Sequence, residues 1–108
     1  MYHRKHYRRL TIAEAKRALA AGYSIIAAEG DAYFRSEEIH SHALMQKLDI
    51  STTQVHRTAF MHLINKGFIR LNEAKSKLPP KNSLHFDRRQ GYYAVWEPVP
   101  EKLATHQN

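Results

Sequence analysis

The sequence predicts a small α+β domain that is mainly helical, with about three helices and one β-hairpin. The chain has 108 residues, which suits a single domain with a modest core. Segments with helix caps and apolar residues at helical spacing recur along it. Two apolar runs, "FIRL" and "YYAVW", flank a basic tract punctuated by Pro79-Pro80 and Gly91, which is typical of two strands joined by a long connection.

The first helix is expected to begin at Thr11, because Glu14 follows three residues later and completes a capping box. Gly22 suits its C-terminal end. The next stretch, "YSIIAAEGDAYF", has two interpretations: a second short helix, or two strands that turn at residues 29–31. Its apolar run is too short for periodicity to decide between them.

Two further helices are predicted on either side of "LDIS". Ser36 would cap the first, with Glu37 and Glu38 in its first turn. Ser51 would cap the second, which we expect to span residues 51–66 and to end at Gly67. One side of this second helix is apolar, and consists of Val55, Ala59, Leu63 and Ile64. The other side carries short hydrogen-bonding or basic side chains, namely Thr52, Thr53, His56 and Arg57.

This order of elements resembles the winged helix-turn-helix superfamily of DNA-binding domains. The resemblance is carried by "SEEIHSHALMQKLDISTTQVHRTAFMHLINKGFIRL", by the wing-like loop 72–91 and by "GYYAVW". It implies a domain over residues 11–97, preceded by a basic N-terminal arm (1–10) and followed by a C-terminal tail (98–108). It also implies that helix 51–66 lies in the major groove of DNA, with the loop as a wing.

The charge of the chain agrees with a nucleic-acid partner. Seventeen Lys and Arg against ten Asp and Glu give a net charge of +7, which favours polyanions and nucleic acid above all. We therefore expect a sequence-specific double-stranded DNA-binding transcriptional regulator of bacterial, plasmid or phage type. Two alternatives stay open: an accessory protein for plasmid or phage replication or transfer, and a winged-helix module that binds protein or RNA.

The expected DNA contacts fall into two groups. Side chains at the start of the predicted helix would read base edges, with Arg57 as a fork on guanine; the set is Ser51, Thr52, Thr53, Gln54, His56 and Arg57. Cations of the wing and the arm would meet phosphates or the minor groove; these are Lys75, Lys77, Lys81, Arg88, Arg89, Arg4, Lys5, Arg8 and Arg9. Among the nearby aromatic residues, Tyr93 and Trp96 are expected in the core, whereas Tyr92 is left open.

Other functions lack a signal. There is no cysteine, and the eight histidines lack the spacing of a metal site, so neither metal nor cofactor is expected. No catalytic motif and no small-molecule site is evident, so we expect no enzyme. No apolar run approaches the roughly 20 residues of a membrane span, which predicts no membrane partner and a cytoplasmic, nucleoid-associated protein. A homodimer through residues 11–34 is expected, because one such domain reads only a short site.

Overall fold

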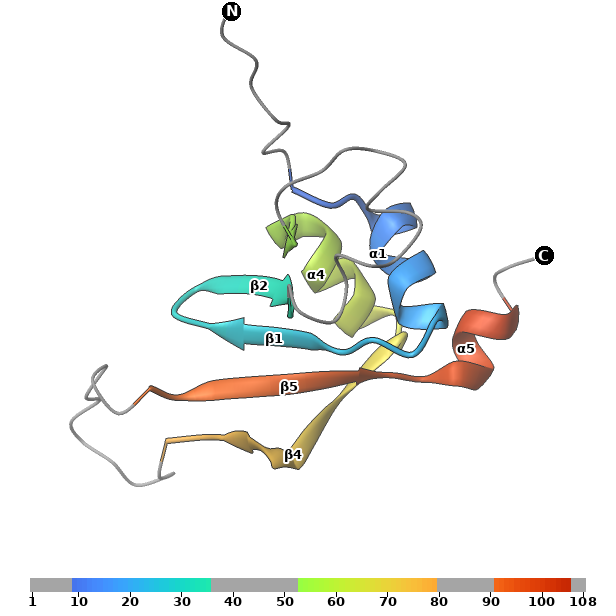
Figure 1. Ribbon diagram of the computed structural model, residues 1–108. Helices are drawn as coiled ribbons and strands as arrows, with labels where there is room; N and C mark the ends of the chain where they lie inside the picture. The colour runs from blue at the N-terminus through green and yellow to red at the C-terminus, as the bar shows by residue number, and fades with distance from the viewer. Residues whose placement is uncertain (1–8, 36–52, 80–90, 106–108) are drawn as a thin grey trace, which may run out of the picture.

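The computed structural model describes residues 9–35, 53–79 and 91–105. Five strands form one antiparallel sheet in the order β3-β2-β1-β5-β4, and α1 and α4 lie on one of its faces (Figure 1). In chain order the elements are α1 (Ile12–Ala20), β1 (Ile25–Ala28), β2 (Asp31–Phe34), β3 (Gln54–Val55), α4 (Arg57–Asn65), β4 (Ile69–Lys77), β5 (Tyr93–Pro98) and α5 (Pro100–Thr105).

The predicted mainly helical fold, with winged helix-turn-helix architecture, is wrong. Within the described residues the helices are α1, α4 and α5, which are short, and the sheet is the larger part of the structure. The main reason for the difference is segment 23–34, for which a helix and a strand pair were both open. It forms the β1–β2 hairpin rather than a helix. Its turn residues Glu29 and Gly30 have φ of 53° and 85°, and a two-residue hairpin turn with positive φ at both positions matches the twist of the strands.

The capping box of the first helix is confirmed. The Thr11 side chain accepts a hydrogen bond from the backbone N–H of Glu14 at 3.4 Å, and the Glu14 carboxylate accepts one from the Thr11 N–H at 3.0 Å. Gly22 follows the helix with a φ of 102°, as expected for a residue in the left-handed region after a helix end. The α1 boundaries therefore follow from local side-chain and backbone chemistry.

The predicted start of the third helix is wrong. Gln54 and Val55 form strand β3, and α4 begins only at Arg57 with His56 as its N-cap. The backbone of this short strand pairs with β2 on one side and with Leu10 on the other. Leu10 donates to the carbonyl of Gln54 at 2.8 Å and accepts from the His56 N–H at 3.1 Å. These sheet bonds satisfy the backbone that a longer helix would otherwise use.

Two predicted features lie outside the described residues: Ser51, the N-cap of the helix predicted over 51–66, and the whole helix predicted to begin at Ser36. The predicted end of the third helix is confirmed, since α4 stops at Asn65 and Gly67 has a φ of 76°.

The core lies between the sheet and the two helices that cover it. The largest fully buried side chains come from both layers, and are Phe34, Leu10, Leu19, Ile25, Leu63 and Val55. Trp96 of β5 packs edge-on against Phe60 of α4, with 5.9 Å between ring centroids. Leu103 of α5 is 2% exposed and joins the same core, so part of the predicted tail 98–108 is a packed helix.

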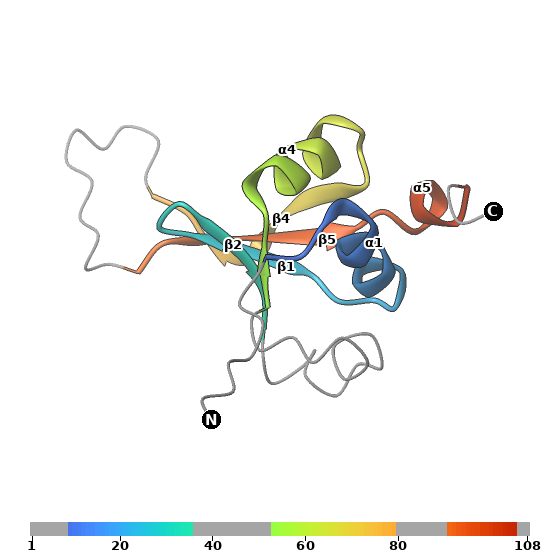
Figure 2. The same ribbon diagram turned by 90° about the horizontal axis from the view of Figure 1, so that it is seen from above.

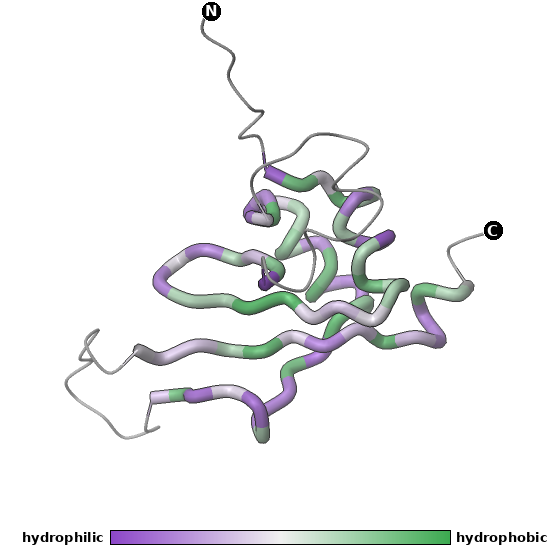
Figure 3. Tube along the Cα trace, viewed as in Figure 1, coloured by the Kyte–Doolittle hydropathy of each residue, from purple (hydrophilic) through white to green (hydrophobic). Residues whose placement is uncertain are grey.

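The predicted pairing of "FIRL" with "YYAVW" is confirmed. β4 and β5 are antiparallel, with Leu71 opposite Trp96, and the register shifts between Asn72 and Lys77. In the shifted stretch the Ser76 hydroxyl accepts a hydrogen bond from the Val95 N–H at 2.8 Å. β4 is an edge strand and largely hydrophilic, whereas the central strand β1 is hydrophobic (Figure 3). None of the helices described here is long and apolar enough to cross a membrane.

Candidate nucleic-acid interface

A groove of about 670 Å³ lies between the exposed side of α4, the β1–β2 turn and the ends of β4 and β5 that adjoin residues 80–90. The β1–β2 turn and those strand ends extend to the same side of the molecule (Figure 2). Three cations from separate parts of the chain line this groove: Arg9, Arg57 and Lys77. Convergence of like charges carries a cost of mutual repulsion, so a basic groove favours an anionic occupant.

One wall of the groove is the first half of α4. The helix begins there because the His56 ring nitrogen Nδ1 accepts a hydrogen bond from the Thr58 N–H at 3.1 Å. Arg57, Phe60 and Met61 line the groove from this wall. Residues four apart share one side of a helix, so Arg57 and Met61 are neighbours. Met61 is 46% exposed, so an apolar side chain stands beside the Arg57 guanidinium at this wall.

The opposite wall comes from the β4–β5 hairpin. Lys77, Leu78, Pro79 and Tyr92 line it, and Leu78 is 43% exposed. The Lys77 ammonium lies 6.0 Å from the centroid of the Tyr92 ring, within the range of a weak cation–π contact. This wall therefore presents a positive charge next to apolar and aromatic surface.

The β1–β2 turn contributes acidic groups. Glu29 and Asp31 both line the groove, and the Gln54 amide donates to the Asp31 carboxylate at 2.8 Å. Gln54 is thus oriented toward a carboxylate on the neighbouring strand. The charges of the groove are therefore divided between its sides: its cations come from residue 9, α4 and β4, and its carboxylates come from the β1–β2 turn and the first residue of β2.

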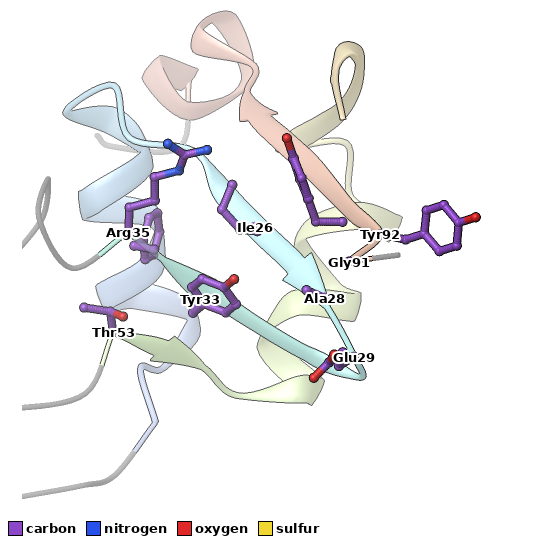
Figure 4. A pocket seen from close by; sticks show the side chains of 10 residues that line it. Ile26, Ala28, Glu29, Tyr33, Arg35, Thr53, Gly91 and Tyr92 are labelled. Carbon is purple, nitrogen blue, oxygen red and sulfur yellow. The ribbon is translucent and has the colours of Figure 1, made fainter. Parts of the chain in front are cut away.

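A second hollow of about 550 Å³ lies on the face of the sheet opposite α1 and α4. Ile26, Tyr33 and Arg35 share this face, and Tyr92 extends away from the end of the sheet (Figure 4). Tyr93 and Tyr92 line both this hollow and the basic groove. Tyr93 and Trp96 were both expected in the core. Trp96 is partly buried and packs against the core, whereas Tyr93 is half-buried at the surface.

The predicted DNA contacts separate into three groups. The groove brings together Arg9, Gln54, Arg57 and Lys77. Thr53 lines the second hollow, His56 caps α4, and Lys75 is exposed on β4, where its N–H donates to the Asn72 side chain at 3.1 Å. The remaining predicted residues lie outside the described part of the chain, and are Ser51, Thr52, Lys81, Arg88, Arg89, Arg4, Lys5 and Arg8.

Sequence reasoning missed Met61, Leu78 and the acidic turn. A signal for Met61 was present, because it follows Arg57 by four residues and lies off the apolar side formed by Ala59 and Leu63. No comparable signal exists for Glu29, since its place beside the groove depends on how the hairpin meets α4.

An ion pair lies on the same hairpin but does not line the groove. Arg70 donates to the Glu97 carboxylate at 2.8 Å and Asn72 donates to its other oxygen at 3.1 Å. The hydrogen bond from Arg70, followed by that from Asn72, lowers the pKa of Glu97 from its ordinary value, and the same pair raises the pKa of Arg70. This cluster links β4 and β5 at a position where Arg70 and Glu97 lie opposite each other in the sheet.

Within residues 9–35, 53–79 and 91–105, no three His, Asp or Glu side chains lie close enough together to hold a metal ion. Comparison with known proteins gives no match to a protein-family model, to a curated protein or to a solved structure.

Proposed function

We propose that this protein binds double-stranded DNA sequence-specifically through the basic groove and acts as a transcriptional regulator. The observation that carries the proposal is the convergence of Arg9, Arg57 and Lys77, from three separate segments, on one groove. Such cations release condensed counterions when they meet phosphates, which supplies affinity for any DNA sequence.

The exposed side of α4 supplies the means to read a sequence. An α-helix fits the major groove of B-DNA, and Arg57 in its first turn has the planar fork that pairs with guanine O6 and N7. Lys77 would contact the phosphate backbone beside the helix, because phosphate contacts set the register of a protein on the duplex. Glu29 and Asp31 would repel phosphates, so they favour one placement of the duplex, along α4 and β4.

The test is a pair of double variants with equal charge. Arg57→Gln/Lys77→Gln removes two cations from the groove. Lys66→Gln/Lys102→Gln removes two exposed cations that do not line it. Both variants are compared with the wild type on duplexes selected from a random pool, over a range of salt concentration, after circular dichroism has confirmed that each is folded.

We expect the groove variant to lose most of its affinity, and the slope of log affinity against log salt to fall by about two. The control variant should stay close to the wild type. Equal losses in both variants would mean that only the overall charge matters, which contradicts a groove-specific interface. A footprint upstream of its own coding sequence would support regulation over a role in replication or transfer.

Single-stranded nucleic acid is a second candidate, favoured by the aromatic side chains beside the cations. Tyr92 and Tyr93 line the groove, and bases stack on such rings without regard to sequence. Competition between a selected duplex and each of its separated strands distinguishes the two candidates. A tenfold preference for a separated strand would replace the duplex proposal.

The homodimer through residues 11–34 stays a prediction that these findings do not test. The apolar side chains on which it relied are buried within the core of the single chain, and include Ala15, Ala18, Leu19, Ile25 and Phe34. A dimer would therefore need other surface. Sedimentation of the free protein and of its DNA complex measures the stoichiometry directly.

A further inference from the structure

Met61 and Leu78 are the large hydrophobic side chains that stand exposed in the described part of the chain, at 46% and 43%. Both line the basic groove. Met61 belongs to α4 and Leu78 follows β4, so the fold brings both to one groove. Exposed apolar side chains in a groove that also carries cations fit a partner that offers an apolar group close to phosphate.

Duplex DNA offers one such group in the major groove, the C5-methyl of thymine. We propose that Met61 reads thymine through this methyl group. The inference rests on the proposed function and deepens it by naming a base that the interface prefers. Met61 suits the role because its flexible thioether side chain adapts to an apolar partner without needing a hydrogen bond.

The position of Met61 on α4 limits where that thymine lies. Arg57 and Met61 share the exposed side of the helix, and four residues advance about 6 Å along a helix axis. Base pairs stack roughly every 3.4 Å along the duplex. A guanine held by Arg57 and a thymine touched by Met61 are therefore expected within about two base pairs of one another. The charge of Arg57 keeps the duplex at the groove while Met61 supplies discrimination.

Replacement of thymine by deoxyuridine tests the contact without changing base pairing, because deoxyuridine lacks only the methyl group. Each thymine of a selected duplex is replaced in turn, and affinity is measured for the wild type, Met61→Ala and Leu78→Ala. Leu78→Ala is the comparison variant: it removes the other exposed apolar side chain of the same groove, so it should lower affinity for the thymine and deoxyuridine duplexes by the same factor.

One replacement should weaken wild-type binding about fourfold, the factor expected for burial of one methyl group. Met61→Ala should bind the thymine and deoxyuridine duplexes equally, whereas Leu78→Ala should keep the wild-type preference. Met61→Leu should show the wild-type preference for the thymine duplex, because leucine keeps an apolar side chain at this position.

Three outcomes would overturn the inference. If the wild type binds duplex DNA but tolerates every deoxyuridine, DNA binding stands and the reading of thymine fails. If no duplex binds, the proposed function fails as well. If Met61→Ala lowers the mass of the protein in sedimentation and weakens all duplexes equally, Met61 belongs to a contact between copies of the chain.

Discussion

The two sides of α4 differ in every respect that matters for function. On its buried side, Ala59 and Leu63 are 3% and 0% exposed and belong to the core. On its other side, Arg57 is exposed and Met61 is 46% exposed, and both line the basic groove, which Ala27, Ala32 and Ala94 of the sheet line as well. One helix of nine residues thus holds the fold together with one side and presents polar and apolar groups with the other. Single substitutions on the two sides should therefore affect stability and the proposed binding separately.

The largest expected effect is on the buried side. Leu63→Ala should lower the free energy of unfolding by about 2–5 kcal/mol, because it removes packed atoms and leaves a cavity. Met61→Ala, two residues away on the exposed side, should change it by no more than about 0.5 kcal/mol. Urea unfolding followed by circular dichroism measures both. Similar losses in the two variants would contradict the division between the sides.

The next effect is on the exposed side and concerns binding alone. Arg57→Ala should weaken binding to the preferred duplex by about 1–3 kcal/mol and change binding to random DNA much less, because a lost base contact removes discrimination. Lys66→Ala serves as the control, since Lys66 is the C-cap residue of the same helix but does not line the groove. A folded Arg57→Ala protein that binds both duplexes like the wild type would remove α4 from base reading.

A third variant changes the acidic turn that faces α4. Glu29 has a positive φ of 53°, which is strained for most side chains and well tolerated by Asn before Gly. Glu29→Asn should stabilise the protein by up to about 1 kcal/mol and should also tighten DNA binding, because a carboxylate leaves the groove. Thermal unfolding and duplex titration test the two parts separately. If Glu29→Asn raises the stability to thermal unfolding but leaves the affinity for DNA unchanged, the Glu29 carboxylate lies away from the bound phosphates.

The smallest effect belongs to the exposed pair Arg70 and Glu97. The folded state lowers the pKa of Glu97 from its ordinary value of 4.5, so the pair stabilises the protein above that pH, and the contribution is lost as pH falls through the lowered value. The stability difference between wild type and Glu97→Gln should therefore shrink from pH 7 to pH 3. Arg70→Gln should show the same trend. A difference that is constant with pH would mean that the carboxylate charge contributes nothing.

The sequence predicted the features that depend on neighbouring residues. Thr11 and Glu14 form the capping box, Gly67 follows the end of α4, and the two apolar runs pair as a hairpin. Each depends on a few residues close in the chain or on a simple pairing of adjacent strands. Arg57 and Lys77 are expected to contact DNA and both line the groove, and those DNA contacts stay a prediction.

The features that were missed depend on contacts between distant segments. β3 is a strand because Leu10 and β2 bond to it from both sides, and this overrides the capping-box pattern that begins at Ser51. The short apolar run "SIIAA" is compatible with either a helix or a strand. Its backbone pairs with β5, and this pairing makes it a strand. Glu29 and Leu78 became site residues for the same reason, since only the assembled sheet brings them near α4.

The strand order has a consequence for how the protein acquires its structure. β5 lies between β1 and β4, although about seventy residues separate β1 from β5 in the chain. Closing so long a loop costs entropy before any pairing compensates for it, and folds rich in such distant pairings form slowly. β5 is also the last strand along the described chain, and its residues Tyr93 and Ala94 line the groove. A nascent chain that lacks β5 would hold β1 and β4 without their shared neighbour, so the five-stranded sheet and the groove would be complete only once that strand is in place.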